Sequence, residues 1–318
     1  MTRLPQIGWL ADGKRLHLQD GPIDLIVEAC GTAKNARAAY EAAVRRFTGL
    51  LDTLCDELPE LRRAAHPDMC MLQGRVARRM HSAVAPFAAA SFITPMAAVA
   101  GAVAEEILDA MTTSADLERA YVNNGGDIAL HLTGDERFAV GLVDHPGMPS
   151  LIGKAVIESR YPIRGIATSG WHGRSFSLGI ADAVTVLART ASQADAAATV
   201  IANAVDLPGH PLIIRRPASE IQPDNDLGVR LVTRDVGKLS HHEIAEALRA
   251  GIRKAREILA MELIEGAALH LQGVTKIAGP KDIYNAMGLP HAETVVRPEN
   301  MLLAAMADET DVRGECVA

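Results

Sequence analysis

Apolar residues alternate with polar ones in some segments of the chain and recur every third or fourth residue in others. The alternation in KRLHLQDG and PIDLIVEACG predicts two strands joined by a turn at Asp20–Gly21. Helical spacing of apolar residues predicts a long helix from about Ala33 to Leu58, with Arg and Glu on its polar face. The N-terminal part is therefore expected to pair strands with a long amphipathic helix.

The most apolar stretch of the chain spans residues 85–111. Pro86, Pro95 and the pair Glu105–Glu106 interrupt this stretch, so we expect a core helix and no membrane span. Thr94 followed by Pro95 is typical of an N-cap and a first helical residue, which places the start of this helix at Pro95.

Strands and helices alternate along the rest of the chain. A short helix is expected to end near Ala120, and an alanine-rich helix to run from about Ser192 to Val205. The capping-box pattern of Ser240 and Glu243 predicts a further helix that ends near Ile264. Strands are expected at DIALHL, RFAVGLVDH, within residues 151–170, and at DAVTVLAR, PLIIRR, GVRLVTR and AALHLQG. This order predicts an α/β (α+β) chain.

Composition narrows the class of protein. A chain of 318 residues that is 48% apolar can bury a sizeable core, in one large or two modest domains. A net charge of -7 and 3% aromatic residues give neither the basic surface nor the stacking platforms expected of a nucleic-acid-binding protein. The four cysteines form no C-x-x-C pair, and the N-terminal segment has no export pattern. We therefore expect a cytoplasmic protein with no nucleic-acid or membrane partner.

The segment NNGGDIALHL, residues 123–132, places two glycines beside an acid at the start of a strand. One interpretation is turn chemistry, because Asn tolerates and Gly readily adopts the left-handed backbone. The other is that Gly125 and Gly126 allow backbone N–H groups to approach an anionic or planar ligand, while Asp127 binds a ribose, a metal or an amide. The segment alone leaves both interpretations open.

Asp195 and Thr199 lie four residues apart on the predicted alanine-rich helix, so their side chains project from one face. In the structural interpretation Ser192 caps the helix, Asp195 favours the positive end of the helix dipole, and Thr199 has no role. In the functional interpretation they form a Mg²⁺ site, because Mg²⁺ needs few protein oxygens besides water and substrate phosphates.

Four short motifs occur in a fixed order and give the second interpretation more weight. They are Gly-Gly-Asp-Ile at 125–128, Ala-Thr-Ser-Gly at 167–170, Val-Thr-Val at 184–186 and Ala-Asp-Ala-x-x-Thr at 194–199. With these motifs the chain resembles the ApbE superfamily of FAD:protein FMN transferases. The resemblance covers roughly residues 120–205 well and the preceding helices loosely.

The resemblance implies a T-fold-like, duplicated architecture with antiparallel or mixed sheets packed by helices. It implies a single ApbE-like domain over residues 1–305, built from two closely packed halves, and composition adds a flexible tail at 306–318. It also implies a cleft that binds FAD with Mg²⁺ across the pyrophosphate. Asp195 and Thr199 match the metal-binding and catalytic positions, and the carbonyl of Ala167 resembles a further metal ligand. The residues implied in flavin binding are Gly125, Gly126, Asp127, Thr168, Ser169 and Gly170.

One segment departs from the family pattern. The transferases carry His-x-x-Asp-Pro-x-Thr-Gly between the Thr-Ser-Gly and Val-Thr-Val motifs, whereas this chain has only WHGRSFSLGIADA at 171–183. Trp171 can stack on a flavin or adenine ring, His172 can exchange protons near neutral pH, and Arg174 can bind phosphate. The structural alternative is a loop with one buried aromatic residue. The chain therefore looks like the cytoplasmic, uncharacterised branch of ApbE-like proteins.

Three functions follow as hypotheses. The first is Mg²⁺-dependent cleavage or FMN transfer at the FAD pyrophosphate. The second is a non-catalytic accessory protein that holds a flavin or another planar heterocycle for a redox partner protein. The third is an enzyme that acts on a small heterocycle without flavin. Because T-fold-like proteins often assemble, a homo-oligomer is compatible with all three.

Overall fold

The computed structural model describes residues 4–143 and 151–280. The chain divides into two compact units, which are described separately below. The first consists of Met1–Arg137, Glu158–Thr168 and Val186–Ala197, and the second of Phe138–Ile157, Ser169–Thr185 and Ala198–Ala318. A single domain over residues 1–305 stays a prediction, and the expected tail at 306–318 lies outside the described residues.

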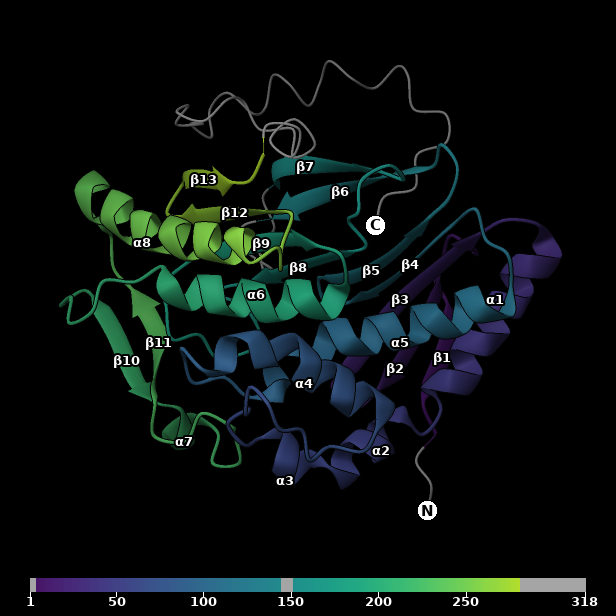
Figure 1. The fold of residues 1–318 in the computed structure, drawn as a ribbon, viewed down its shortest axis with the longest axis horizontal. Coiled ribbons are helices and arrows are strands. Elements are labelled where there is room, and N and C mark those ends of the chain that lie inside the picture. Colours follow the sequence, from purple (N-terminus) through teal and green to yellow (C-terminus); the bar gives the residue numbers. More distant parts are fainter. Residues whose placement is uncertain (1–3, 144–150, 281–318) are drawn as a thin grey trace. The chain divides into compact units, whose positions relative to one another are not determined.

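Antiparallel strands form the sheet of the first unit (Figure 1). Their order is β1 (Gln6–Trp9), β2 (Leu16–Asp20), β3 (Ile23–Cys30), β4 (Arg119–Asn124), β5 (Asp127–Leu132) and β8 (Gly165–Ser169). In β2 the buried positions alternate with half-buried ones, as the sequence pattern predicts.

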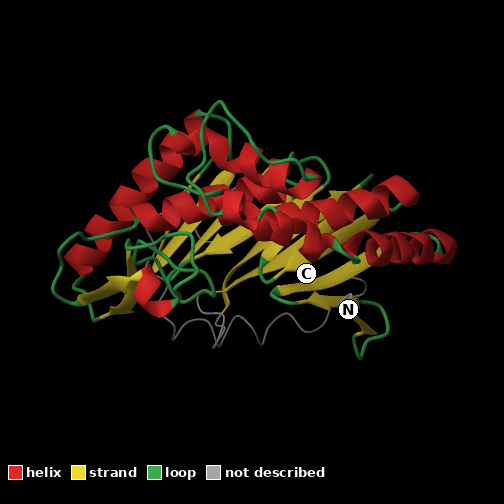
Figure 2. Ribbon diagram, turned by 90° about the horizontal axis from the view of Figure 1, so that it is seen from below, coloured by secondary structure: helices red, strands yellow, loops and turns green. Residues whose placement is uncertain are grey.

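Helices cover one face of this sheet (Figure 2). They are α1 (Ala33–Phe47), α2 (Leu50–Asp56), α3 (Leu58–Leu61), α4 (Arg75–Ala88), the 3-10 turn η1 (Pro95–Ala98) and α5 (Val99–Ser114). Helix α1 packs against β2 and β3, and α5 packs against β4 and β5. Val103, Ile107 and Met111 of α5 are completely buried, so the apolar stretch of the sequence forms a core helix. Among the described helices, none combines the length and apolarity needed to cross a bilayer.

The structure corrects two predicted helix boundaries and one predicted helix. The predicted helix over 33–58 is broken at Gly49, whose φ of 77° is left-handed. Pro95 begins a 3-10 turn, and Thr94 makes no side-chain capping bond to it, so the α-helix starts only at Val99. The predicted helix near Ala120 is wrong: this segment is β4, because it pairs with β3 and buries Tyr121 in the core. Helix α4 was not predicted.

The glycine pair forms the hairpin turn between β4 and β5. Asn124 pairs with Asp127, which leaves Gly125 and Gly126 as a two-residue turn with φ values of 66° and 113°. The N–H of Gly126 donates to Oδ1 of Asn123 at 2.9 Å. Turn chemistry is therefore confirmed, and the approach of a ligand to this turn stays a prediction.

The second unit contains pairs of neighbouring strands and a long helix. Strand β10 (Ile213–Pro217) pairs with β11 (Leu231–Val236), with α7 (Ala218–Ile221) between them, and β12 (Gly266–Leu271) pairs with β13 (Val274–Ala278). Strands β6 (Arg137–Val143) and β7 (Leu151–Glu158) form a further pair. Helix α8 (His241–Ala260) packs on β12 and β13. Strand β9 (Ala183–Ala188) and helix α6 (Ala191–Ala204) contribute residues to both units.

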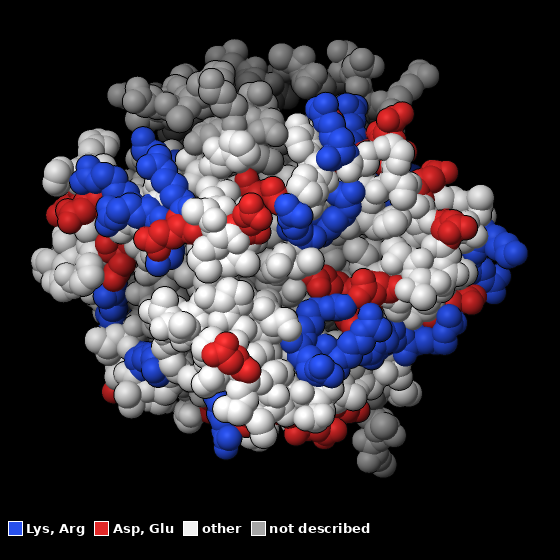
Figure 3. Space-filling model, viewed as in Figure 1, with Lys and Arg blue, Asp and Glu red and all other residues white. Residues whose placement is uncertain are grey.

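The capping box predicted at the start of α8 is confirmed. The N–H of Glu243 donates to the Ser240 hydroxyl, and the N–H of Ser240 donates to Oε2 of Glu243 at 2.7 Å. The α/β fold class, with antiparallel sheets packed by helices, is confirmed as well. On the face drawn in Figure 3, basic side chains gather over α4 and the end of α1, next to acidic ones.

Candidate functional site

The start of α6 is held by two close backbone approaches in the first unit. A Cβ added to Gly101 of α5 would lie 2.3 Å from the carbonyl oxygen of Ala191. A Cβ added to Gly165 of β8 would lie 2.1 Å from the carbonyl of Thr190. Only glycine fits at both positions, so these two residues fix where the first turn of α6 lies.

Asp195 uses this position to cap a different helix. Its Oδ2 accepts the N–H of Gly101 at 2.9 Å, near the N-terminus of α5. The N-cap residue of α5 is Ala98, which has no side-chain acceptor for the free N–H groups of the first turn. Asp195 therefore supplies from α6 the cap that α5 lacks. The interpretation that places Asp195 in the first turn of its own helix is wrong, because α6 begins at Ala191 and its first turn contains no acidic residue.

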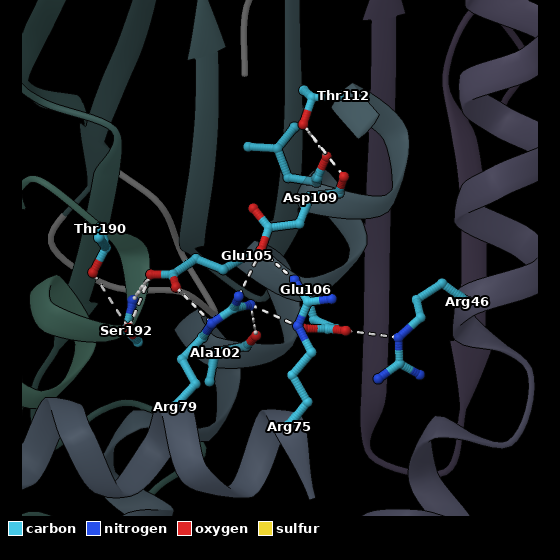
Figure 4. Close-up of polar contacts among 11 residues, drawn as sticks. Arg46, Arg75, Arg79, Ala102, Glu105, Glu106, Asp109, Thr112, Thr190 and Ser192 are labelled. Atoms are coloured by element: carbon cyan, nitrogen blue, oxygen red, sulfur yellow. Dashed lines mark hydrogen bonds and ion pairs between the residues drawn. The ribbon is translucent and has the colours of Figure 1, made fainter. Parts of the chain in front are cut away.

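The two helices cap each other. Oε1 of Glu105 on α5 accepts the N–H of Ser192 at 2.7 Å and its hydroxyl at 2.9 Å (Figure 4). The expected N-cap role of Ser192 is wrong, because the hydroxyl of Thr190 accepts the N–H of Gln193 in the cap position of α6. Ser192 is instead the point at which α5 binds the N-terminus of α6.

The environment of Asp195 favours the protonated acid. Burial raises the pKa of the Asp195 carboxyl well above its usual range, and the negative charge of Asp127 raises it further. The N–H groups of Gly101 and Ala100 lower this pKa, and the charge of Glu105 again raises it. Burial and the two negative charges together therefore disfavour ionisation of Asp195 more than the two N–H donors favour it.

Asp127 links the glycine turn to the Ala-Thr-Ser-Gly motif. It is the first residue of β5 after the turn, and its Oδ1 accepts the N–H of Thr168 on β8 at 3.3 Å. Thr168 is exposed, whereas Ala167 beside it is completely buried. The structure thus brings Gly125, Gly126, Asp127 and Thr168 to one end of β5 and β8.

The fit of this region to a divalent cation depends on its donor atoms. Asp195 offers a carboxylate whose repulsion from Asp127 a cation would relieve, which suits a hard ion such as Mg²⁺. Thr199 is half-buried one turn further along α6. In the part of the chain that the structure describes, no group of three or more His, Cys, Asp or Glu side chains could hold a metal. Any cation here therefore needs hydroxyl, carbonyl or water oxygens as well.

The segment 170–183 has its own polar centre in the second unit, at Asp182. Trp171 Nε1 donates to Asp182 Oδ1 at 3.1 Å, and His172 Nε2 lies 3.3 Å from the same oxygen. The N–H of Gln272 donates to Oδ2 at 2.5 Å. The Trp171 and His172 rings lie 3.8 Å apart between centroids, tilted by 36°.

The contacts at Asp182 show which of the predicted loop residues are held in place by the fold. Trp171 and His172 are half-buried, and Arg174 is exposed. Gly170 is pressed against Asp182, because a Cβ there would lie 2.2 Å from the Asp182 carbonyl oxygen. The sequence singles out Trp171, His172 and Arg174, but the central role of Asp182 depends on a strand pair 90 residues away. No local spacing indicates it.

Comparison with known proteins first defines the class. The fold is similar to that of the crystal structure of the apbe protein from Thermotoga maritima, with a TM-score of 0.51 and 12% identity. The comparison covers 89% of this chain and 100% of that one. At this identity the likeness concerns the fold alone, an α/β fold with antiparallel sheets packed by helices.

The chain belongs to the family described as AbpE bacteria, which it matches over residues 7–277. Among its relatives is a UPF0280 protein from Methanopyrus kandleri, 41% identical over 131 residues, or 40% of this chain and 48% of the relative. A UPF0280 protein from Methanosarcina barkeri is 34% identical over 185 residues, 58% of this chain and 70% of that one. The chain thus spans about half the length of the first relative. The family resemblance inferred from the four motifs is confirmed.

Proposed function

We propose that this chain binds FAD with Mg²⁺ in the region of Asp195 and acts on the FAD pyrophosphate. The observation that carries this proposal is the environment of Asp195, where burial and the negative charge of Asp127 raise the Asp195 pKa although two backbone N–H groups oppose the rise. Such a pair of acids is costly in an apo protein and suits a site that receives a cation. Membership of an ApbE-like family supports flavin as the nucleotide.

Each residue has a distinct role in this proposal. Asp195, Thr199 and the carbonyl of Ala167 hold Mg²⁺, which supplies positive charge against the two phosphates of FAD. Asp127 and the exposed Thr168 line the nucleotide side, and the turn at Gly125–Gly126 lets the flavin approach the backbone closely. Ser169, Gly170 and the Trp171–Arg174 segment complete the proposed flavin contacts.

The reaction breaks the P–O–P link of FAD. Attack by water yields FMN and AMP, whereas attack by a hydroxyl of an acceptor protein yields the flavinylated acceptor and AMP. Asp195 and Thr199 would act as the catalytic residues by holding the cation, which would stabilise the negative charge that develops on the phosphates.

A second candidate is an accessory protein that binds a flavin or another planar heterocycle for a redox partner, without cleavage. The observation that favours it is segment 171–183, which lacks the His-x-x-Asp-Pro-x-Thr-Gly pattern of the transferases. Asp182 in this segment accepts donors from Trp171 and Gln272 and lies beside His172. A loop built in this way can position a ring without providing an acceptor site.

The test is isothermal titration of the full chain with FAD, with and without Mg²⁺, followed by chromatography for FMN and AMP. Asp195→Asn is the variant, because its amide oxygen can still accept the N–H of Gly101. Glu57→Gln is the matched control, because Glu57 also accepts backbone N–H groups before a helix, from Gly74 at 2.7 Å and Gln73 at 2.6 Å.

We expect Mg²⁺-dependent binding that Asp195→Asn weakens by at least about a hundredfold, because losing a direct ligand should cost no less than losing an outer-shell partner. Glu57→Gln should leave this binding unchanged. FMN and AMP among the products identify the enzyme. Binding without products identifies the accessory protein. Absence of FAD binding in both conditions contradicts the FAD enzyme and the flavin-binding form of the accessory protein, and it favours a protein that acts on or holds another heterocycle.

A further inference from the structure

A pocket of about 420 Å³ lies in the first unit, between the end of α1, the start of α4 and the later turns of α5. The charged side chains that line it are Arg45, Arg46, Arg75, Glu106 and Asp109. Figure 3 shows basic side chains gathered over this part of the surface, and Figure 4 shows the polar contacts beneath it. The pocket is distinct from the contacts of Asp195, which lie at the N-terminus of α5.

A buried carboxylate organises the arginines of this pocket. The Glu106 side chain is only 1% exposed, and its Oε1 accepts Arg46 Nε at 2.7 Å. Its Oε2 lies 3.1 Å from Arg75 Nε and 3.2 Å from Arg79 Nη1. Because a buried charge must be paired, this carboxylate fixes guanidinium groups from α1 and α4 in one place (Figure 4).

Arg46 and Arg75 contact Glu106 in a way that leaves some of their guanidinium N–H donors unused by this carboxylate. Arg46 and Arg75 both use Nε, the inner nitrogen of the guanidinium fork. Within residues 4–143 and 151–280, the Nη groups of Arg46 have no carboxylate partner. Arg75 uses Nη2 for Asp109 at 3.1 Å, which leaves its Nη1 as a further donor in the described part of the chain.

The most exposed charged side chains that line the pocket are arginines. Arg45 and Arg75 are 68% and 66% exposed, and the nearest acid to Arg45 is Glu41, at 4.0 Å. The acids are either buried beneath the pocket, as Glu106 is, or already paired, as Asp109 is with Arg75 and Arg79. An anion that enters the pocket would therefore meet guanidinium donors before it meets a free carboxylate.

A purely structural network does not explain all of these arginines. Ion pairs between α4 and α5 account for Arg79, which contacts Glu105, Glu106 and Asp109. They do not account for Arg45, which contacts no residue of α5 among the described ion pairs. The ion pairs between α4 and α5 also do not explain why the two Nη groups of Arg46 have no carboxylate partner among the described residues.

We propose that this pocket is a binding site for a phosphate-bearing anion, held by Arg45, Arg46 and Arg75. The planar fork of arginine matches the tetrahedral oxygens of phosphate with two parallel N–H donors. Glu106 acts as the positioning residue, because it holds two of the three forks before the ligand arrives. The site does not depend on the proposed FAD site.

The experiment is isothermal titration of the full chain with inorganic phosphate and with pyrophosphate, at constant ionic strength maintained with sodium chloride. Arg45→Gln is the variant, because Arg45 lines the pocket without supporting Glu106. Arg37→Gln is the matched control: Arg37 lies on the same helix and pairs with the same Glu41, at 2.9 Å, outside the pocket.

We expect saturable binding that Arg45→Gln weakens by about tenfold, the usual effect of losing one charge-assisted contact. Arg37→Gln and Asp195→Asn should bind as the unaltered chain does, and circular dichroism should show all variants folded. Arg46→Lys should also weaken binding, because it keeps the charge and loses the fork. Equal losses in Arg45→Gln and Arg37→Gln would overturn the proposal, since they would reflect general charge. No binding above the chloride control would overturn it as well.

Discussion

Asp195 and Glu243 both accept backbone N–H groups at helix N-termini, yet their pKa values move in opposite directions. The hydrogen bond with His210, followed by those with Ser240, lowers the pKa of Glu243 to about 2. Burial, followed by the charge of Asp127, raises the pKa of Asp195 well above its usual range despite its two N–H donors. The first acid completes the capping box of its own helix, and the second caps a helix from another part of the chain.

The difference shows what a helix terminus does and does not determine. Donor N–H groups and the helix dipole favour a carboxylate at both positions. At Glu243 a histidine adds to that preference. At Asp195 two further acids oppose it, and the fold contains no described cationic partner for Asp195 that would compensate. A stability cost concentrated at one acid is characteristic of functional sites, which is why Asp195 and not Glu243 is proposed to bind a ligand.

The largest effect is expected from breaking the contact between the two helices at Asp195. Gly101→Ala places a Cβ 2.3 Å from the Ala191 carbonyl oxygen and must separate α5 from α6. We expect a loss of about 3 kcal/mol in the free energy of unfolding, measured in urea, because overpacking outweighs the better helix propensity of Ala.

Gly8→Ala is the control for this variant, because an added Cβ there meets nothing within 4 Å. It should change the free energy of unfolding by less than about 0.5 kcal/mol, as surface substitutions usually do. If Gly101→Ala is equally mild, the cap formed by Asp195 does not depend on close backbone approach.

An intermediate effect is expected from removing the charge of Asp195. The unfolded carboxyl loses its proton near 3.8, whereas the folded one keeps it to higher pH. Stability of the cation-free protein should therefore fall as pH rises from about 3.8 through the raised folded pKa. Asp195→Asn should lack this fall and unfold a few degrees higher at neutral pH, in thermal scans with EDTA. A lower unfolding temperature for Asp195→Asn at neutral pH would show that the ionised carboxylate stabilises the fold.

The smallest effect is expected at Glu243. Its folded pKa lies below the ordinary value of 4.5, so its contribution is present above that value and is lost as pH falls toward about 2. Glu243→Gln should slightly lower the thermal unfolding temperature at pH 6, and the difference from the unaltered chain should shrink in acid. Glu246→Gln, at an exposed position one turn further along α8, is the control. If Glu243→Gln and Glu246→Gln have the same pH profile of stability, the hydrogen bonds of Glu243 do not give it a pH-dependent contribution of its own.

Several features could be predicted because their cause lies within a few residues. The turn at Gly125–Gly126 follows from the left-handed backbone that glycine adopts, and the capping box of Ser240 and Glu243 from two bonds across three residues. The alternation of strands and helices gave the α/β class. The four motifs gave the family, because their order along the chain is itself part of the sequence.

Local sequence patterns thus predict most strands and helices, the fold class and the candidate residues, although they miss α4 and assign the segment before Ala120 to a helix. Which of the candidate residues meet depends on the packing of segments that lie far apart along the chain. The bond from Gly101 to Asp195 joins residues 94 positions apart, and the one from Gln272 to Asp182 joins residues 90 apart. Such contacts depend on how closely two backbones approach. The glycines that allow this approach follow no sequence pattern from which the contact could be predicted. The raised pKa of Asp195 has the same origin, because burial and the charge of Asp127 arise only when distant strands and helices pack together.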